Sequence, residues 1–457
     1  MPKLWGGRFA KNASKLMEEF NDSLPFDKRL WKEELLASDA YSVALGKAGI
    51  FSRTELARVR RAFKEIDKEF SQGKFRFKPA DEDIHTAIER RLVEKVGETG
   101  KRIHTGRSRN EQVATDERLY LKNVNQEIML LILELQKSVV GLAANTADDI
   151  IPSYTHMQQA QLVRLGHYFM SLFFMLETDH SRLDDLSKRV DILPLGSGAV
   201  AGSTLRLDRD VLKRELGFAE LSANSIAAVS DRDFMNEFLF AAAQTLIHLS
   251  RFAEDLIVWS STEFSFVELD DMYSTGSSMM PQKKNPDSLE LVRGKVSRTI
   301  ANLTALLTLQ KGLPLTYSKD LQEDKEPLFD SVDTIISTLR VFTGVISTLK
   351  VNRKNLLRNT DDSIYATDIA DYLVEQGVPF RDAHGIVGRL VLTGIKQGRR
   401  LRDFGTDELK EISPIFNEGY YTIFEPVRSV ERHDNYGGTS RKGLKKQIEL
   451  AGKILSR

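Results

Sequence analysis

Five long stretches of this sequence contain no proline beyond their first turn and are rich in alanine, leucine, glutamate and lysine. They run from Gln112 to about Asn145 and over residues 157–189, 227–262, 286–312 and 326–350. In the first stretch, apolar residues recur every three or four positions, at Val124, Ile128, Leu131, Leu135, Val139 and Leu142. This spacing places them on one face of an α-helix. Long helices of this kind pack side by side as a bundle.

Some of these stretches are apolar on more than one face. The run Phe238-Leu239-Phe240-Ala241-Ala242-Ala243 is an example. A helix that is apolar all round is surrounded by other helices, which indicates subunit association through the bundle. The chain ends differ, with shorter helices and Gly/Pro-marked turns. We therefore expect an all-α protein with an N-terminal domain at 1–105, a central long-helix bundle at 106–355 and a C-terminal helical domain at 356–457.

Charge and composition exclude several classes of function. Sixty-five lysines and arginines balance 65 acidic residues, so no global field attracts nucleic acid or an anionic membrane. The absence of cysteine excludes disulfides, zinc–thiolate and iron–sulfur sites, and thiol catalysis. The amino terminus lacks the apolar segment of a signal peptide, and no apolar run is long enough to cross a membrane. A soluble, cytoplasmic protein is expected.

A polar loop precedes the predicted helix at 286–312. It begins Tyr273-Ser274-Thr275-Gly276-Ser277-Ser278, passes Pro281 and ends in Lys283-Lys284-Asn285. Backbone N–H groups at a helix amino terminus, a lysine ammonium and an asparagine amide all favour an anion. The loop therefore predicts a carboxylate or phosphate site. A Walker-type phosphate loop is the rival, although its glycine and lysine spacing is not met, and a plain surface linker is the other alternative.

Three more polar segments lie just before a predicted long helix or at its start. They are residues 83–86, 104–112 and 153–159. Helix ends from separate segments can converge on one cleft. His85 and His156 are expected at such helix starts and are candidates for functional groups, with ordinary packing as the alternative. The run from Lys319 to Lys325 would ordinarily be a solvated helix start, and no acidic spacing specifies a metal site.

The loop resembles the signature of the fumarase/aspartase superfamily. Residues 276–285 match its pattern Gly-Ser-Ser-x-Met-Pro-x-Lys-x-Asn in full. The segments at 104–116, 154–161, 230–234, 317–331 and 380–388 are similar to those of the argininosuccinate lyases within that superfamily, as is Trp5-Gly6-Gly7-Arg8-Phe9. The resemblance covers essentially the whole chain. It implies a fumarase/aspartase-like fold whose long central helices form the core of a homotetramer, with active sites shared between subunits.

The resemblance also implies a reaction, the reversible anti β-elimination of argininosuccinate to arginine and fumarate without a metal or an organic cofactor. Ser277 would be the base, and His156, with Glu290 as its charge partner, the general acid. Lys283 and Asn285 would stabilise the carboxylate as it gains charge. A serine hydroxyl is a poor base unless cations and oriented donors stabilise its oxyanion.

Substrate contacts are implied for further residues of the matching motifs. Arg109, Asn110 and Thr155 would bind the carboxylates of the fumarate part. Ser23, Arg232, Tyr317, Gln322 and Lys325 would bind the rest of the substrate, mainly on the arginine side, and His85 would help to shape the cleft.

Three alternatives stay open at this point. Another lyase of the superfamily would act on fumarate, aspartate or adenylosuccinate. A structural protein, such as the lens crystallins recruited from this family, is opposed by the presence of Ser277, Lys283, Asn285, His156 and Glu290. A nucleic-acid-binding module finds no support, because the sequence has neither a basic stripe nor an aromatic platform.

Overall fold

A computed structural model describes residues 13–456, so the Trp5–Phe9 motif lies outside the described residues. The described chain is mainly helical, which confirms the predicted all-α class. It forms two compact units. The first contains the described residues up to Leu130 together with 181–244 and 296–336, and the second contains 131–180, 245–295 and the residues from Ser337 onward. The predicted domain boundaries near 106 and 356 stay predictions.

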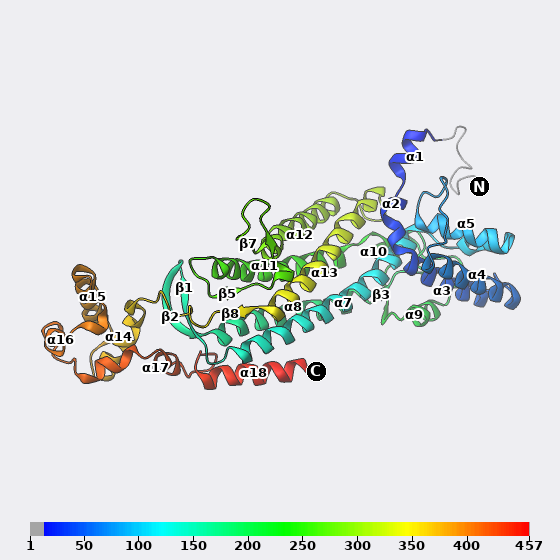
Figure 1. The fold of residues 1–457 in the computed structure, drawn as a ribbon. Helices are drawn as coiled ribbons and strands as arrows, with labels where there is room; N and C mark the ends of the chain where they lie inside the picture. The colour runs from blue at the N-terminus through cyan, green and yellow to red at the C-terminus, as the bar shows by residue number, and fades with distance from the viewer. Residues whose placement is uncertain (1–12, 457) are drawn as a thin grey trace. The chain divides into compact units, whose positions relative to one another are not determined.

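The long helices are present as expected (Figure 1). They are α7 (Arg109–Asn145), α8 (Leu165–Val190), α11 (Asp233–Ser260), α12 (Asp287–Lys311) and α13 (Lys325–Thr348). Polar contacts join them within each unit. In the first unit Asn125 of α7 donates to Ser187 of α8 at 2.8 Å, and in the second unit His248 of α11 lies 2.6 Å from Asp179 of α8. The same helices therefore contribute to both cores.

Two predicted helix starts are wrong. Residues 157–164 are not helical, because β2 (Gln158–Arg164) pairs antiparallel with β1 (Ile150–Thr155). Pairing and the burial of Ile151 and Leu162 override the helix propensity of the glutamines and alanine. The stretch from 227 is also interrupted, because α10 (Ser225–Ser230) ends before Arg232 and α11 begins after it.

The remaining elements of the first unit surround the start of α7. They are α1 (Lys15–Asn21), α2 (Leu24–Asp27), η2 (Lys28–Leu30), α3 (Trp31–Lys47), α4 (Arg53–Ser71), α5 (Ile84–Val96), α6 (Glu98–Lys101), η3 (Arg102–His104), β3 (Ile192–Leu193), α9 (Arg209–Leu216), β4 (Glu220–Leu221) and η5 (Lys319–Asp324). The Asp83 carboxylate caps α5 by accepting from the Thr86 N–H at 2.6 Å. This cap fixes the start of α5, where His85 lies.

The second unit adds short strands and the C-terminal helices. Its further elements are β5 (Val267–Glu268), η4 (Asp271–Tyr273), β6 (Thr275–Gly276), β7 (Lys284–Asn285), β8 (Lys350–Val351), η6 (Asp362–Tyr365), α14 (Ala366–Glu375), α15 (Phe380–Gln397), η7 (Leu401–Asp403), α16 (Thr406–Ile412), η8 (Glu418–Phe424), α17 (Pro426–Glu431) and α18 (Arg441–Leu455). Phe416 and Tyr420 are buried in the apolar core that α14 to α17 enclose. Ile150 and Leu162 also belong to this core, so it supports the strands on either side of His156.

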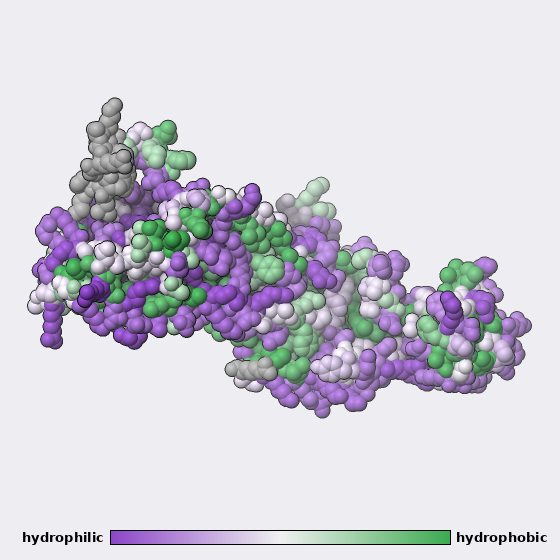
Figure 2. Space-filling view, turned by 180° about the vertical axis from the view of Figure 1, so that it is seen from behind, coloured by the Kyte–Doolittle hydropathy of each residue, from purple (hydrophilic) through white to green (hydrophobic). Residues whose placement is uncertain are grey.

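Apolar areas interrupt the polar surface (Figure 2). Large apolar side chains are exposed on the long helices, among them Leu130, Phe240, Leu291, Ile300 and Leu307. Exposed apolar patches of this kind often mark surfaces that contact another protein. Among residues 13–456, no helix is both long enough and apolar enough to cross a membrane.

Candidate active site

The loop at 276–285 is the tip of a narrow hairpin in the second unit, close to β7 in Figure 1. Its base is closed where Thr275 pairs with Asn285 and Gly276 pairs with Lys284. The tip is open to solvent, and Met279 is 86% exposed. The predicted catalytic loop therefore has a fixed base and an accessible tip.

Ser277 lies just inside this tip. Its Oγ accepts hydrogen bonds from the backbone N–H groups of Met279, at 3.3 Å, and Met280, at 3.0 Å. Two donors on one hydroxyl oxygen stabilise the negative charge that the oxygen would carry as an alkoxide. The local backbone thus supplies part of what a serine base requires.

The two adjacent lysines of the loop have different partners. Lys283 donates from Nζ to the Asn285 side-chain oxygen at 2.6 Å. Lys284 is bonded to two carboxylates, Asp271 at 2.7 Å and Glu268 at 3.1 Å. Because an ammonium has three donors, Lys283 keeps two for a ligand, whereas most of the charge of Lys284 is already compensated. Lys283 is the better anion-binding group of the two.

His156 lies in the turn of the β1–β2 hairpin and not at a helix start, so that prediction is wrong. Thr155 pairs with Gln158, and the two turn residues His156 and Met157 have φ of 54° and 59°. Such turns favour Asn-Gly, because a Cβ is strained at positive φ. A His-Met pair is thus a poor choice for turn stability, and strain of this kind points to a functional position.

Glu290 lies in the first turn of α12 and is exposed, as are His156 and Thr155. Among residues 13–456, neither His156 nor Glu290 makes a side-chain hydrogen bond or ion pair. The structure therefore does not join these two predicted partners within one chain. The groups expected to move protons lie on the surface of the second unit with their hydrogen-bonding capacity unused.

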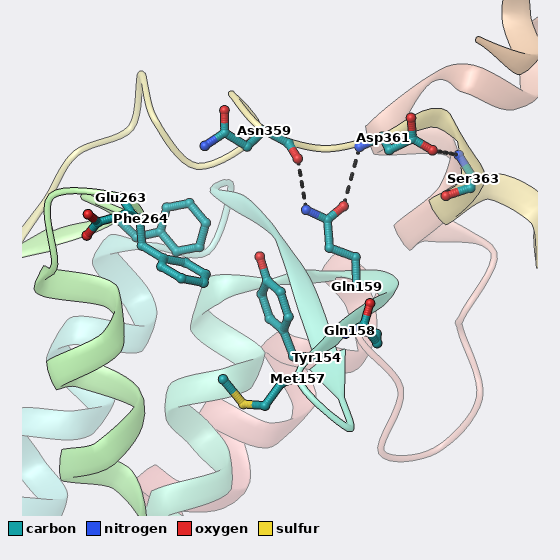
Figure 3. A pocket seen from close by; sticks show the side chains of 10 residues that line it. Tyr154, Met157, Gln158, Gln159, Glu263, Phe264, Asn359, Asp361 and Ser363 are labelled. Carbon is teal, nitrogen blue, oxygen red and sulfur yellow. Dashed lines mark hydrogen bonds between the residues drawn. The ribbon is translucent and has the colours of Figure 1, made fainter. Parts of the chain in front are cut away.

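A depression of about 600 Å³ borders the β1–β2 hairpin (Figure 3). Tyr154 and Phe264 face each other in it, with ring centroids 5.9 Å apart. The Gln159 side chain donates to the Asn359 carbonyl at 2.9 Å and accepts from the Asp361 N–H at 3.3 Å. These bonds tie the hairpin to the segment that leads into the C-terminal helices. Residues 276–285 do not line this depression. We therefore interpret the contacts around it as an anchor for the β1–β2 hairpin.

Arg109 is the first residue of α7, in the first unit. Its Nε lies 3.1 Å from Asp83, its Nη2 donates to Thr86 at 3.1 Å, and its Nη1 donates to Gln112. Burial disfavours the charge on Arg109, but Asp83 and Glu34 outweigh this effect and raise the guanidinium pKa. About a quarter of the side chain is exposed, and not all of its N–H groups are used. Arg109 is therefore a cation that its partners hold in place and that can still bind an anion.

A buried acid pair lies behind Arg109. Gln112 donates to both oxygens of Glu34 at 2.7 Å, and His85 Nδ1 lies 2.7 Å from Glu34 and 3.3 Å from Asp116. Burial and the nearby Glu34 raise the pKa of Asp116 well above its usual range. Burial also disfavours the charge on Glu34, but His85 and Arg107 outweigh it and hold the Glu34 pKa below its usual range. The two pKa values are thus shifted in opposite directions, which favours the proton on Asp116 over Glu34.

The atoms of Glu34, His85 and Asp116 lie within 4.8 Å of one another, an arrangement that a divalent cation could use. However, Gln112 and Ser38 already donate to the Glu34 oxygens that a cation would need. Burial and the nearby Glu34 favour the protonated form of Asp116, which reduces the negative charge that would attract a cation. We therefore interpret this group as a hydrogen-bonded acid pair.

Arg232 and Lys325, both predicted to bind substrate, are buried in the first unit beside Glu117 and Asp324. All four side chains interact directly. The expected solvated helix start at 319–325 is therefore wrong for Asp324 and Lys325, although Lys319, Asp320 and Glu323 are exposed. Neither carboxylate was predicted, because a single acidic residue in a helical pattern usually lies on a solvated face.

The other predicted substrate residues of the first unit are partly or fully buried. Ser23 donates to Asp27 at 2.6 Å, which leaves its oxygen able to accept. Burial raises the pKa of Tyr317, and the positive charge of Lys325 opposes this shift. Gln322 and Asn110 are half-buried. The structure thus brings Tyr317, Arg232 and Lys325 into electrostatic contact, while Ser23 lies with Asp27 at the start of α2.

Comparisons with known proteins define the class. Residues 7–301 match the family described as Lyase, and residues 363–431 match the family described as argininosuccinate lyase C-terminal. A variant of EDDS lyase with bound fumarate superposes with a TM-score of 0.86 at 27% identity, over 98% of this chain and 91% of that chain. A class II fumarase from Schistosoma mansoni, 16% identical with a TM-score of 0.77, shares the fold. The chain belongs to this lyase class.

Full-length relatives narrow the class to one family. The argininosuccinate lyase of Carboxydothermus hydrogenoformans is 49% identical over 99% of this chain and all of its own. That of Symbiobacterium thermophilum is 48% identical over 100% of this chain and 99% of its own. The chain is a member of the argininosuccinate lyase family, which confirms the resemblance inferred from its motifs.

Proposed function

We propose that the chain cleaves argininosuccinate reversibly to arginine and fumarate by anti β-elimination. The observation that carries this proposal is the pair of backbone N–H groups that donate to Ser277 Oγ in a loop that also bears Lys283. Removing a weakly acidic C–H proton beside a carboxylate requires a base whose oxyanion is stabilised. It also requires a cation where the new charge develops.

The steps follow from these groups. Ser277, as the alkoxide, takes the proton from the carbon next to the carboxylate, whose oxygens then carry the additional charge. Lys283 and Asn285 stabilise that charge. The C–N bond of the substrate breaks while the adjacent carbon–carbon bond becomes the double bond of fumarate. His156 gives a proton to the departing guanidino nitrogen. Glu290 favours the charged form of His156 beforehand.

The remaining candidates bind the substrate. Arg109, Asn110 and Thr155 contact the carboxylates of the fumarate part. Ser23, Tyr317, Gln322 and Lys325 contact the rest of the molecule. His85 acts by holding Glu34 behind Arg109, and no metal or organic cofactor takes part.

The enzyme is a homotetramer in this proposal, and its active sites are shared between subunits. Two observations support it. Ser277, His156 and Glu290 lie in one unit and have no side-chain partner in the part of the chain that the structure describes, while most candidate substrate-binding residues lie in the other. The long helices also carry exposed apolar side chains that other subunits would cover. Full activity of a folded monomer at nanomolar concentration would contradict it. A cytoplasmic location is likewise proposed, and cell fractionation tests it.

The activity is tested by supplying argininosuccinate and following the ultraviolet absorbance of fumarate. We expect a signal from argininosuccinate and none from malate, aspartate or adenylosuccinate. A signal only from one of those three would assign another activity of the same superfamily. No signal from any of them, with a folded tetramer, would favour a structural role.

A further inference from the structure

Arg232, Lys325, Glu117 and Asp324 form a closed charge quartet in the first unit. Arg232 Nε lies 2.8 Å from Asp324 and 2.9 Å from Glu117. Lys325 Nζ lies 2.8 Å from Asp324 and 2.9 Å from Glu117. Each cation thus touches both anions, and the charges of the quartet sum to zero.

The quartet joins three separate segments of the chain. Glu117 lies on α7, Arg232 lies between α10 and α11, and Asp324 and Lys325 lie at the junction of η5 and α13. Arg232 also donates through Nη1 to the carbonyl of Asp231 at 3.0 Å. The four side chains therefore fix the ends of three helical segments relative to one another within this unit.

The two cations differ in what they can reach. The Arg232 side chain has no exposed surface, whereas that of Lys325 is 5% exposed. Two of the three ammonium donors of Lys325 are used by Glu117 and Asp324, which leaves one for a ligand. Arg232 Nη2 has no hydrogen-bond partner among the described residues, but it is completely buried. A substrate could therefore reach Lys325 but could not reach Arg232 without opening the fold.

We propose that Arg232 is a positioning residue that does not touch the substrate, and that with Glu117 and Asp324 it holds Lys325 so that one ammonium donor faces the substrate. This inference rests on the proposed function and revises the role expected for Arg232 from its motif. Without Arg232 the two buried carboxylates would share one cation, and an uncompensated buried charge is strongly destabilising.

A charge-balance experiment tests the proposal. The variants Arg232→Gln, Glu117→Gln and the double variant are compared for thermal midpoint, KM and kcat. We expect Arg232→Gln to lower the midpoint and to raise KM about tenfold or more, and the double variant to recover much of both losses, because it removes one charge of each sign. If Arg232 instead bound the substrate, removing Glu117 could not restore KM. An additive or unrecovered KM in the double variant would overturn the proposal.

Arg232→Lys covers the case in which Arg232→Gln does not fold. Lysine keeps the buried charge but loses the planar donor fork. We expect the retained charge to limit the fall in the thermal midpoint and the KM to stay within about threefold of the original. A rise in KM of about tenfold or more at an unchanged midpoint would assign Arg232 to the substrate instead. The thermal midpoints need no substrate, so they test the quartet even if the original chain releases no fumarate from argininosuccinate.

Discussion

In the first unit the cations Arg109, Arg232 and Lys325 are bonded to carboxylates that the fold buries. In the second unit His156 and Glu290 are exposed and have no side-chain partner among residues 13–456, and the Ser277 hydroxyl accepts from backbone N–H groups of its own loop. The groups proposed to bind substrate are thus held by buried partners, whereas the groups proposed to move protons have no side-chain partner among the described residues. Fixed charges and exposed reactive groups therefore lie in separate units of the chain.

The largest effect should follow from Ser277→Ala. Loss of a general base typically costs about 10²- to 10⁴-fold in turnover, and the exposed loop tip can lose one hydroxyl without disturbing a core. We expect turnover to fall by that factor with an unchanged thermal midpoint. Fumarate release and a melting curve measure the two. Nearly normal turnover in a folded variant would remove Ser277 from the role of base.

The hairpin turn offers the next test. Asparagine tolerates positive φ better than most residues, so His156→Asn should keep the turn or stabilise it while it removes the proton donor. We expect a turnover loss of about 10²-fold or more and a thermal midpoint equal to or above that of the original chain. A lower midpoint would mean that the histidine supports the fold.

A smaller effect on turnover should follow from a substitution that displaces the base of the loop at 276–285. A Cβ on Gly344 would lie 2.0 Å from the Tyr273 hydroxyl, and Tyr273 directly precedes the loop, where its carbonyl accepts from Ser288 at 2.6 Å. Gly344→Ala should displace Tyr273 and reduce turnover about 10- to 100-fold, because small misplacements of catalytic groups are costly.

Gly452→Ala in α18 is the matched control for this substitution. Nothing lies within 4 Å of its added methyl group, so turnover should not change. The helix should gain up to about 1 kcal/mol, because alanine loses less backbone entropy than glycine. Equal losses of turnover in the two variants would show that the effect of Gly344→Ala does not come from displacement of the loop.

The smallest effect concerns the buried acid pair. The pKa of Asp116 is raised in the folded chain, so above its unfolded pKa the folded state holds a proton that the unfolded state has released. Stability then falls as pH rises, by up to about 1.4 kcal/mol per pH unit. Asp116→Asn removes this dependence, so its thermal midpoint relative to the original chain should rise with pH above the unfolded pKa of the carboxyl group, until Asp116 ionises in the folded chain. A difference that is constant with pH would mean that Asp116 is ionised in the fold.

The sequence predicted the long helices and the loop at 276–285 because both depend on local pattern. Helix periodicity persists over many turns, and the loop carries its reactive residues in one continuous segment. The hairpin of His156 was missed, because its glutamines and alanine favour a helix and only pairing with residues 150–155 overrides that preference.

The buried carboxylates were missed for a different reason. Glu34, the adjacent pair Asp116 and Glu117, and Asp324 lie in three distant parts of the sequence, and each one alone resembles a solvated residue. Their burial is decided by which helices surround them, which no local pattern encodes. One signal was present, since Thr115, Asp116 and Glu117 are consecutive polar residues in a stretch that is otherwise packed, and all three are completely buried.

The central claim is that the fixed groups of one subunit act on the same substrate as the reactive groups of another. The decisive experiment mixes two variants that are each inactive, one with Arg109→Gln in the first unit and one with Ser277→Ala in the second, under conditions of demonstrated subunit exchange. The account predicts that fumarate release returns in the mixture, because some sites then combine an intact Arg109 with an intact Ser277 from different chains. A mixture that stays inactive after exchange would contradict it.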